Sequence, residues 1–258
     1  MNLQLNPEYA EGYSSNAQIA RILTEKWVEE NAYCPRCGTE VLVKEKNNSP
    51  VLDFHCPCCH QGFELKGSSK KTGHKIVDGE YNAMIRRITS NTNPDFFILN
   101  YQLSNYTVTN FLLVPKQFIT SSVIEKRNPL SDSARRAGWT GCNILVDMIP
   151  KDGVVYLVKD SVVSDKNDVL SKLRQTEFLT TIDSTKRGWL VDVMRCIDSL
   201  DADDFSLSEV YNFEEELQHL HPENKHVQAK IRQQLQVLRD KGYIEFCGNG
   251  NYRKMENR

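Results

Sequence analysis

The residues with the clearest chemistry in this 258-residue chain are four cysteines in two close pairs. Cys34 and Cys37 form one C-x-x-C turn, and Cys56 and Cys59 form a second turn after an 18-residue gap, residues 38 to 55. Such a turn directs two thiolates at one ion, and two turns complete a tetrahedral site with ribbon-type spacing. We therefore predict a structural Zn²⁺ site. Four thiolates leave no open coordination position, so we expect this ion to stabilise a loop-rich region and to do no chemistry.

Other interpretations of these cysteines stay open. Cys58, His55 and His60 lie beside the second pair, and each could replace one of its ligands. Free buried cysteines are disfavoured because the residues around the first pair form a polar turn. A redox C-x-x-C motif is disfavoured because the motif occurs twice.

A second set of residues, Asp53, Glu64 and Lys66, has the spacing D-x10-E-x-K. Side chains alternate along a strand, so Glu64 and Lys66 should point to the same side, and Asp53 faces them if its strand pairs with theirs. The two carboxylates, with the Leu65 carbonyl as a third oxygen, are the kind of ligands that Mg²⁺ prefers. A metal-bound water has a lowered pKa, and Lys66 could orient or deprotonate it beside a phosphate. The pattern predicts metal-dependent phosphodiester hydrolysis.

An E-x-K pattern on a strand is more often a solvated salt bridge than an active site. Two neighbouring features favour the active site. The strand-like runs are otherwise apolar, which places the acids against a core. Four lysines (Lys66, Lys70, Lys71 and Lys75) come before the next acid, Asp78, and suit a phosphate backbone. We predict that Lys70 and Lys71 contact DNA.

The elements that must position these groups alternate between helix and strand. Residues 14–32 have apolar residues at helical spacing, with Ser14 or Ser15 as a cap. Strands are expected over 51–55, 62–66, 95–101, 111–114 and 154–158, a basic loop over 67–75 and a helix over 78–89. The predicted fold class is α/β or α+β, and residues 1–182 form the predicted nuclease domain with the inserted zinc site.

Residues 183–258 have the pattern of a winged helix, an α+β variant of helix-turn-helix. Apolar spacing predicts helices over 186–200, from Ser206 to Leu220, and over 226–241, with an acidic break over 201–204. A hairpin with an Asn249-Gly250 turn follows. In helix-turn-helix proteins the last of these helices enters the major groove.

Charge is concentrated where DNA contact is expected. The whole chain has a formal net charge of −2, whereas from Pro222 onward eight basic residues oppose four acidic ones, a local net of +4. Arginine suits guanine and glutamine suits adenine in the major groove. The predicted DNA contacts here are Lys230, Arg232, Gln233, Gln236 and, in the hairpin, Arg253. A merely solvated helix face is the alternative.

Arg135-Arg136-Ala137-Gly138-Trp139 is the best candidate for a DNA contact in the nuclease domain. The two arginines could hold phosphates and Gly138 lets the backbone approach. The indole of Trp139 could touch an apolar methyl group in the major groove, as proteins touch the thymine methyl. A buried core tryptophan is the alternative.

Composition is that of an ordinary globular protein, with 40% hydrophobic and 26% charged residues. No apolar run of about 18 residues and no basic, apolar leader occurs, so we expect no membrane span and a cytosolic location. Cytosolic cysteines are seldom in disulfides, which again favours metal. We further expect a monomer.

Taken together, the chain resembles the PD-(D/E)xK nucleases, and more specifically the dam-replacing family of DpnI-type methyl-directed restriction endonucleases. The resemblance spans nearly the full length. It is carried by both C-x-x-C pairs and by residues 20–25 (ARILTE), 63–66 (FELK), 113–118 (LVPKQF), 134–139 (ARRAGW) and 230–241 (KIRQQLQVLRDK). One departure from the broad nuclease motif is Leu52, which stands where a proline usually precedes the aspartate.

The resemblance implies Mg²⁺-dependent cleavage of double-stranded DNA within adenine-methylated GATC, with blunt ends. It also implies a structural zinc, two domains that each recognise the methylated site, and the bacterial cytosol as location. Two other functions fit the same residues. One is a zinc-containing winged-helix regulator without catalysis, and the other is a repair nuclease that selects DNA structure instead of methylation.

Overall fold

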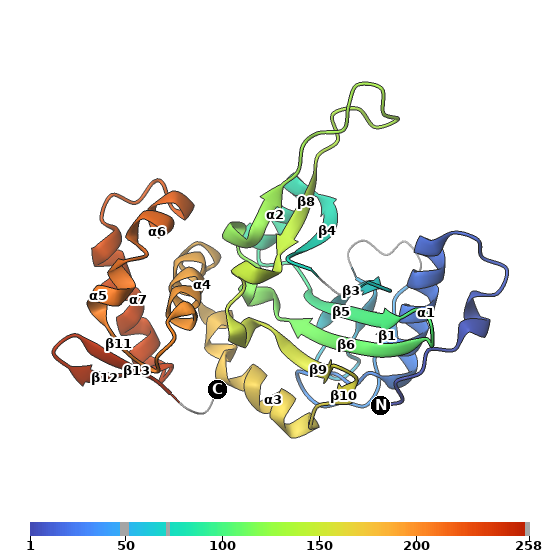
Figure 1. Ribbon diagram of the computed structural model, residues 1–258, viewed down its shortest axis with the longest axis horizontal. Helices are drawn as coiled ribbons and strands as arrows, with labels where there is room; N and C mark the ends of the chain where they lie inside the picture. The colour runs from blue at the N-terminus through green and yellow to red at the C-terminus, as the bar shows by residue number, and fades with distance from the viewer. Residues whose placement is uncertain (47–51, 71–72, 256–258) are drawn as a thin grey trace. The chain divides into compact units, whose positions relative to one another are not determined.

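The computed structural model describes residues 1–46, 52–70 and 73–255 (Figure 1). These residues form two compact units, each assembled from separate segments. Unit 1 comprises 1–76, 92–116 and 153–174, and unit 2 comprises 77–91, 117–152 and 175–258. The expected boundary between residues 182 and 183 therefore stays a prediction. Among the described residues, every helix is too short or too polar to cross a bilayer.

Unit 1 is built on a seven-stranded mixed sheet of order β1-β2-β3-β5-β6-β9-β10 (Figure 1). The β3–β5 pair is parallel and the other pairs are antiparallel. The strands are β1 (Val43–Lys44), β2 (Phe54–His55), β3 (Gly62–Ser68), β5 (Asp95–Gln102), β6 (Thr107–Val114), β9 (Val155–Lys159) and β10 (Val162–Val163). The three longer apolar strands predicted from the sequence are confirmed as β5, β6 and β9.

A row of aromatic rings joins this sheet to helix α1 (Asn16–Asn31). Phe63 of β3 stacks on Phe97 of β5 at 4.5 Å, Phe97 lies 4.8 Å from Phe111 of β6, and Trp27 of α1 meets Phe111 edge-on at 5.3 Å. All four side chains are buried. Each ring buries a large apolar area, and the offset geometries add to that stabilisation. The row therefore fixes α1 against the face of the sheet that carries Phe63.

The remaining helix of unit 1, α3 (Lys166–Gln175), was not predicted. It buries Val169 and Leu173 in the same core and lies beside the first cysteine turn, where Gly38 faces Lys166 and Leu170. Its apolar positions are few and widely spaced, which explains why the sequence pattern was weak.

Two predictions around the catalytic spacing are corrected. The strand expected over 51–55 is only Phe54–His55; Asp53 lies in a bend before it, and Val51 is outside the described residues. The basic loop expected from Gly67 begins later, because β3 continues to Ser68 through its pairing with Leu99 and Asn100 of β5.

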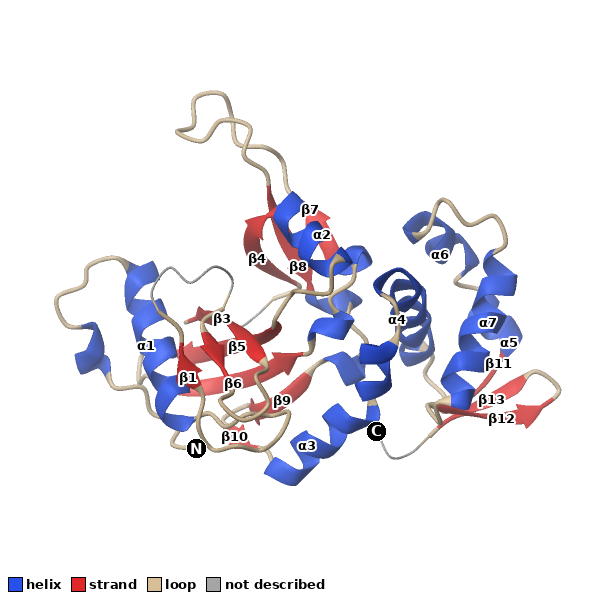
Figure 2. Ribbon diagram, turned by 180° about the vertical axis from the view of Figure 1, so that it is seen from behind, coloured by secondary structure: helices blue, strands red, loops and turns tan. Residues whose placement is uncertain are grey.

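Unit 2 contains a small three-stranded sheet of order β4-β8-β7, apart from the first two residues of β4, and helix α2 covers it (Figure 2). The elements are β4 (Lys75–Glu80), α2 (Tyr81–Thr89), β7 (Ile124–Lys126) and β8 (Gly141–Leu145). The helix expected over 78–89 begins only at Tyr81. The reason is the cap: the Glu80 carboxylate accepts the backbone N–H groups of Asn82 and Ala83, which fixes the first turn there.

A long loop, residues 127–140, connects β7 to β8 and extends from the small sheet as an arm (Figure 2). Its base is closed by backbone hydrogen bonds from Arg127 to Gly141 and between Leu130 and Trp139. Most of its residues are exposed.

The C-terminal part of unit 2, from α4 onward, is the winged helix. It contains α4 (Ser184–Ser199), β11 (Asp204–Ser206), α5 (Leu207–Tyr211), α6 (Glu214–Leu220), α7 (Val227–Asp240), β12 (Ile244–Gly248) and β13 (Asn251–Lys254). Asn249 and Gly250 have positive φ values of 50° and 76°, so the predicted hairpin turn is present.

The single helix predicted from Ser206 to Leu220 is wrong. Ser206 and Glu209 form a capping box that starts α5, but α5 ends at Tyr211 and a separate α6 begins at Glu214. The predicted acidic break also contains the start of β11, which pairs with β13 and closes a three-stranded sheet.

Candidate active site and zinc site

The first feature of the candidate active site is an edge of β3 that, among the residues the structure describes, its neighbour β2 leaves open in part. Strand β2 pairs with β3 at only two positions, Phe54 with Phe63 and His55 with Gly62. Immediately before β2, the Asp53 Oδ2 atom accepts the backbone N–H of Leu65 at 2.7 Å. A side-chain oxygen thus accepts the hydrogen bond that a neighbouring strand would otherwise accept from β3. Asp53 therefore lies next to Leu65, the residue between Glu64 and Lys66.

Glu64 and Lys66 project from the same face of β3, as the strand period requires. Lys66 Nζ lies 2.5 Å from Glu64 Oε1 and 6.0 Å from the centroid of the Phe96 ring on β5. Both side chains are largely covered, with 22% of Lys66 and 15% of Glu64 exposed. The alternative was a salt bridge fully exposed to solvent. The Glu64–Lys66 pair differs from it, because both side chains are partly buried on an otherwise apolar strand.

Burial raises the pKa of Asp53 above its ordinary value. The nearby charge of Glu25 raises it further, while the Leu65 N–H and the charges of Lys66 and Arg21 lower it. Burial and neighbouring carboxylates both disfavour the ionised form of a carboxyl group. A cation bound beside it stabilises that ionised form and offsets the repulsion between the carboxylates. This is the electrostatic situation expected at a divalent metal site before the metal binds.

The oxygen donors present fit a hard cation. Asp53 and Glu64 supply carboxylates. The Leu65 N–H points to the open edge, and in a strand the C=O of a residue points to the same side as its N–H. The predicted third oxygen therefore lies on the edge that Asp53 occupies. Oxygen donors of this kind suit Mg²⁺.

Sequence reasoning missed the charged residues of α1 that lie near this edge. Glu25 is buried, with 9% of its side chain exposed, and contacts Lys44 of β1 at 2.8 Å and Arg21 at 3.6 Å. A signal was present in the sequence. Glu25 falls at helical spacing with Val28 on the inward face of α1, where an unpaired acid would be costly.

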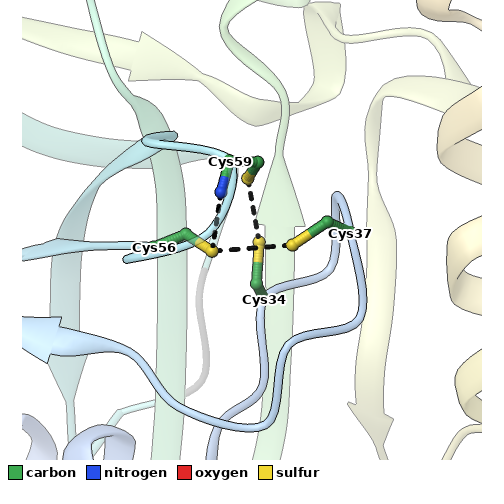
Figure 3. Close-up of side chains that lie close together, drawn as sticks. All are labelled: Cys34, Cys37, Cys56 and Cys59. Carbon is green, nitrogen blue, oxygen red and sulfur yellow. Dashed lines mark hydrogen bonds between the residues drawn. The ribbon is translucent and has the colours of Figure 1, made fainter.

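The four predicted zinc ligands lie together (Figure 3). Their sulfur atoms are all within 4.8 Å of one another, with 3.6 Å between Cys34 and Cys59 and 3.5 Å between Cys37 and Cys56. A tetrahedral ion with metal–sulfur bonds of about 2.3 Å needs sulfur separations of about 3.8 Å. The cluster therefore has the dimensions of a zinc site.

Local turns direct these thiols inward. The N–H of Gly38 donates to the Cys34 carbonyl at 2.8 Å, and the N–H of His60 donates to the Cys56 carbonyl at 3.0 Å. Both turns end on a residue with positive φ, 81° at Gly38 and 60° at His60. Burial raises the pKa of the Cys34 thiol, and raises that of Cys59 to about 11, so a cation is needed to hold them as thiolates at neutral pH.

The three alternative ligands lie outside the cluster. The residues whose ligand atoms all lie within 4.8 Å of one another are Cys34, Cys37, Cys56 and Cys59, and the ring of His55 is instead 2.6 Å from Glu45. The four-cysteine prediction thus fits the structure better than any substitution by these residues.

Of the two lysines after β3 that were predicted to contact DNA, Lys70 is among the described residues. Lys70 is exposed, and its carbonyl accepts a hydrogen bond at 2.9 Å from the buried amide of Asn100 on β5. That bond fixes the chain just beyond β3. Lys71 lies outside the described residues.

The arm presents the predicted Arg135, Arg136 and Trp139. Arg135 and Arg136 are exposed, and Trp139 is half-buried, so the alternative of a buried core tryptophan does not hold. The guanidinium of Arg136 lies 4.7 Å above the indole centroid. Gly141 makes room for the ring, since a Cβ atom there would be 2.9 Å from it. The Trp139 indole thus contacts other residues of the arm and its base, Arg136 over the ring and Gly141 beside it.

Helix α7, which was predicted to enter the major groove, buries Ile231, Leu235 and Leu238 and turns its polar side to solvent. Lys230 donates to Gln233 at 2.8 Å on that side. The other predicted contacts on this unit are Arg232, which donates to the Tyr211 hydroxyl, the exposed Gln236, and Arg253, which pairs with Asp204.

The sequence was compared with models of known families. The model DpnI, described as the Dam-replacing family, matches residues 1–182, and the model of the Dam-replacing HTH domain matches residues 185–254. The first match covers both cysteine turns, the open edge of β3 and the arm. The second covers the winged helix.

Proposed function

This chain is a member of the Dam-replacing family, and from that premise we propose that it is a type II restriction endonuclease that cleaves double-stranded DNA at adenine-methylated GATC sites. The observation that carries the proposal is the open edge of β3. There Asp53 is bonded to the backbone between Glu64 and Lys66. An acid, a second acid and an amine at one accessible strand edge are what phosphodiester hydrolysis with a divalent ion requires.

In this proposal Asp53, Glu64 and the Leu65 carbonyl hold Mg²⁺, which when bound lowers the pKa of a water and stabilises negative charge on the phosphate. Lys66 contributes through its position. Its ammonium group already neutralises Glu64, so it can move from that carboxylate toward a phosphate oxygen or the attacking water without being newly desolvated. The zinc cluster has a structural role, since four thiolates leave no place for substrate.

Recognition is divided between two exposed elements of unit 2. The arm offers Arg135 and Arg136 for phosphates and the half-buried Trp139 as an apolar wall. The methyl group of N6-methyladenine lies in the major groove, where such a wall gives favourable contact. The solvent side of α7 offers Gln233 and Gln236 for base edges. We further propose that the protein acts as a monomer in the bacterial cytosol, in a host that lacks adenine methylation of this site.

The test is a digestion with Mg²⁺ of one plasmid prepared from cells with and without Dam methylation. We expect cleavage of the methylated plasmid only, and none by Lys66→Ala. Lys159→Ala is the matched control, because it removes an exposed lysine on β9 of the same sheet and should cleave as the wild type does.

Each other outcome has a definite meaning. Equal cleavage of both plasmids would refute methyl direction and favour the structure-selective nuclease. Binding of DNA without cleavage by the wild-type protein at any Mg²⁺ concentration would favour the zinc-containing winged-helix regulator.

A further inference from the structure

One face of helix α1 is pressed against the catalytic strand. Gly67 directly follows Lys66 on β3, and a Cβ atom at this position would overlap the side chain of Thr24. Thr24 is buried and bonds back to the Ala20 carbonyl at 2.8 Å, so it cannot easily move aside. This contact fixes the axial position of α1 next to the residues proposed to do the chemistry.

Along the helix, Arg21, Glu25 and Val28 follow one another at spacings of four and three residues and therefore share that face. Their exposure is graded. Val28 is completely buried, Glu25 is 7% exposed as a residue, and 58% of the Arg21 side chain is exposed. The face thus begins in the core of unit 1 and ends with an arginine at the surface.

Glu25 is a buried acid with two cationic neighbours, Lys44 and Arg21. With Lys44 it forms a 2.8 Å ion pair, which compensates its burial. Arg21 Nε lies 3.6 Å from Glu25 Oε1, beyond hydrogen-bonding distance. The carboxylate therefore orients the guanidinium without holding it in a tight pair, so that most of its donors stay available.

These charges lie close to Asp53. Glu25 lies 2.8 Å from Lys44 of β1 and 3.6 Å from Arg21, and Thr24, between the two on α1, packs against Gly67, the residue after Lys66 on β3. Lys44 pairs with Phe54, the residue after Asp53, in the β1–β2 ladder. Three separate elements (α1, β1 and β3) thus bring charged groups to one edge, and of the two charged residues on this face of α1, Arg21 is the exposed cation and Glu25 the buried acid.

We propose that Arg21 is a further catalytic residue, which contacts a non-bridging oxygen of the phosphate being cleaved, and that Glu25 is its positioning residue. The inference rests on the proposed nuclease function. An arginine carries a fixed planar set of donors that matches phosphate oxygens, and its charge would stabilise the negative charge that develops during attack. Phosphate arriving at Asp53 and Lys66 would displace the weak contact between Arg21 and Glu25.

The test uses the full-length protein on an oligonucleotide duplex with one methylated GATC site. Single-turnover cleavage is measured at saturating enzyme, and affinity is measured separately with Ca²⁺ in place of Mg²⁺. For Arg21→Ala we expect cleavage to be slower by about a hundredfold to a thousandfold, the range for loss of one transition-state donor. Affinity and thermal midpoint should stay within error. Arg21→Lys should recover part of the rate, and Glu25→Gln should lose less than Arg21→Ala.

Lys26→Ala is the matched control. It removes one positive charge from the same helix, and Lys26 likewise pairs with an acid on its own helix, Glu29 at 2.7 Å. We expect it to cleave at the wild-type rate. Equal rates for Arg21→Ala and Lys26→Ala would overturn the inference, as would a rate defect that disappears at higher Mg²⁺ for both Arg21→Ala and Glu25→Gln. A wild-type protein that never cleaves would instead refute the proposed function.

Discussion

Arg36 and Asp95 form a two-point ion pair between the first cysteine turn and strand β5. Arg36 Nε lies 2.8 Å from Asp95 Oδ2 and Nη2 lies 3.0 Å from Oδ1. Asp95 is fully buried and also accepts the backbone N–H of Lys116 at 2.7 Å. Asp95 pairs with Phe63 of β3, the residue before Glu64, so the turn that carries Cys34 and Cys37 is fastened beside β3.

The first prediction concerns this pair. Arg36→Met leaves the Asp95 carboxylate buried without its cation, and loss of one partner of a buried pair costs about 3–5 kcal/mol of unfolding free energy. Urea denaturation measures it. The control is Lys166→Met, which breaks the more exposed pair with Glu40 near the same turn and should cost about 0–1 kcal/mol. Equal losses in the two variants would contradict the structural role assigned to Arg36.

The second prediction concerns the zinc cluster. Cys56 follows Asp53 by three residues, and β2 lies between them. Cys34→Ser should therefore lose bound zinc, measured by elemental analysis, and should also lose cleavage that added Mg²⁺ does not restore. Cys58→Ser removes an exposed cysteine that lies between Cys56 and Cys59 in the second turn and should keep both zinc and cleavage. Retention of full activity by zinc-free Cys34→Ser would show that the cluster does not support the active site.

The third prediction follows from the raised pKa of Asp53, which has burial as its main cause. A carboxyl group whose folded pKa exceeds its unfolded value binds its proton more tightly in the folded state. It therefore favours folding below the unfolded pKa, and that contribution is lost as pH rises through the folded pKa. At neutral pH the ionised group is a cost, so Asp53→Asn should raise the thermal midpoint in metal-free buffer while abolishing cleavage.

The gain from Asp53→Asn should shrink as the pH is lowered toward about 4, because wild-type Asp53 then takes up its proton. The same substitution at the exposed Asp132 of the arm is the control and should leave the midpoint unchanged. A lower midpoint for Asp53→Asn at neutral pH would show that the ionised carboxylate stabilises the fold, which is the opposite of the effect expected from its burial.

The fourth prediction concerns the arm. Trp139→Ala removes the proposed apolar wall from a half-buried position, so the fold should be little affected. An apolar contact of methyl size is worth about 1–3 kcal/mol in discrimination. The ratio of cleavage rates on methylated and unmethylated duplexes should fall about tenfold or more. Trp139→Phe should keep most of the ratio, and an unchanged ratio in Trp139→Ala would assign methyl readout to another element.

The fifth prediction concerns α7. Lys230→Ala should weaken binding to all sequences and reduce the slope of log affinity against log salt by about 1, as loss of one phosphate contact does. Gln236→Ala should instead lower the preference for the specific site by about 1–3 kcal/mol with the slope unchanged. Competition binding at several salt concentrations distinguishes the two, and identical behaviour of both variants would refute the assigned roles.

Much of the site could be predicted from the sequence because it depends on local spacing. Two C-x-x-C turns bring sulfurs together whatever the surrounding fold, and the strand period places Glu64 and Lys66 on one face. The long apolar strands β5, β6 and β9 and the helix α7 were found for the same reason, since their periodicity is uninterrupted.

What could not be predicted depends on long-range pairing. Asp53 bonds to Leu65 because β2 stops short, and nothing local in residues 51–55 announces that end. Glu25 becomes part of the site only when α1 is placed against Gly67, a contact between residues far apart in the chain. The start of α2 was misplaced because a glutamate cap at Glu80 is a weaker signal than serine or aspartate.

The shortness of β2 also bears on how the protein stays dispersed. Among the described residues, β2 covers only part of this edge of β3, and an uncovered strand edge offers its amides to any other extended chain, a route to aggregation that natural proteins obstruct with charge. Along this edge the charge is the carboxylate of Asp53, which accepts the hydrogen bond of the Leu65 N–H and so makes that donor unavailable to another chain. The Asp53 carboxylate, which we propose binds metal, then also hinders self-association through this edge. Asp53→Ala should therefore yield a protein that is inactive and less soluble.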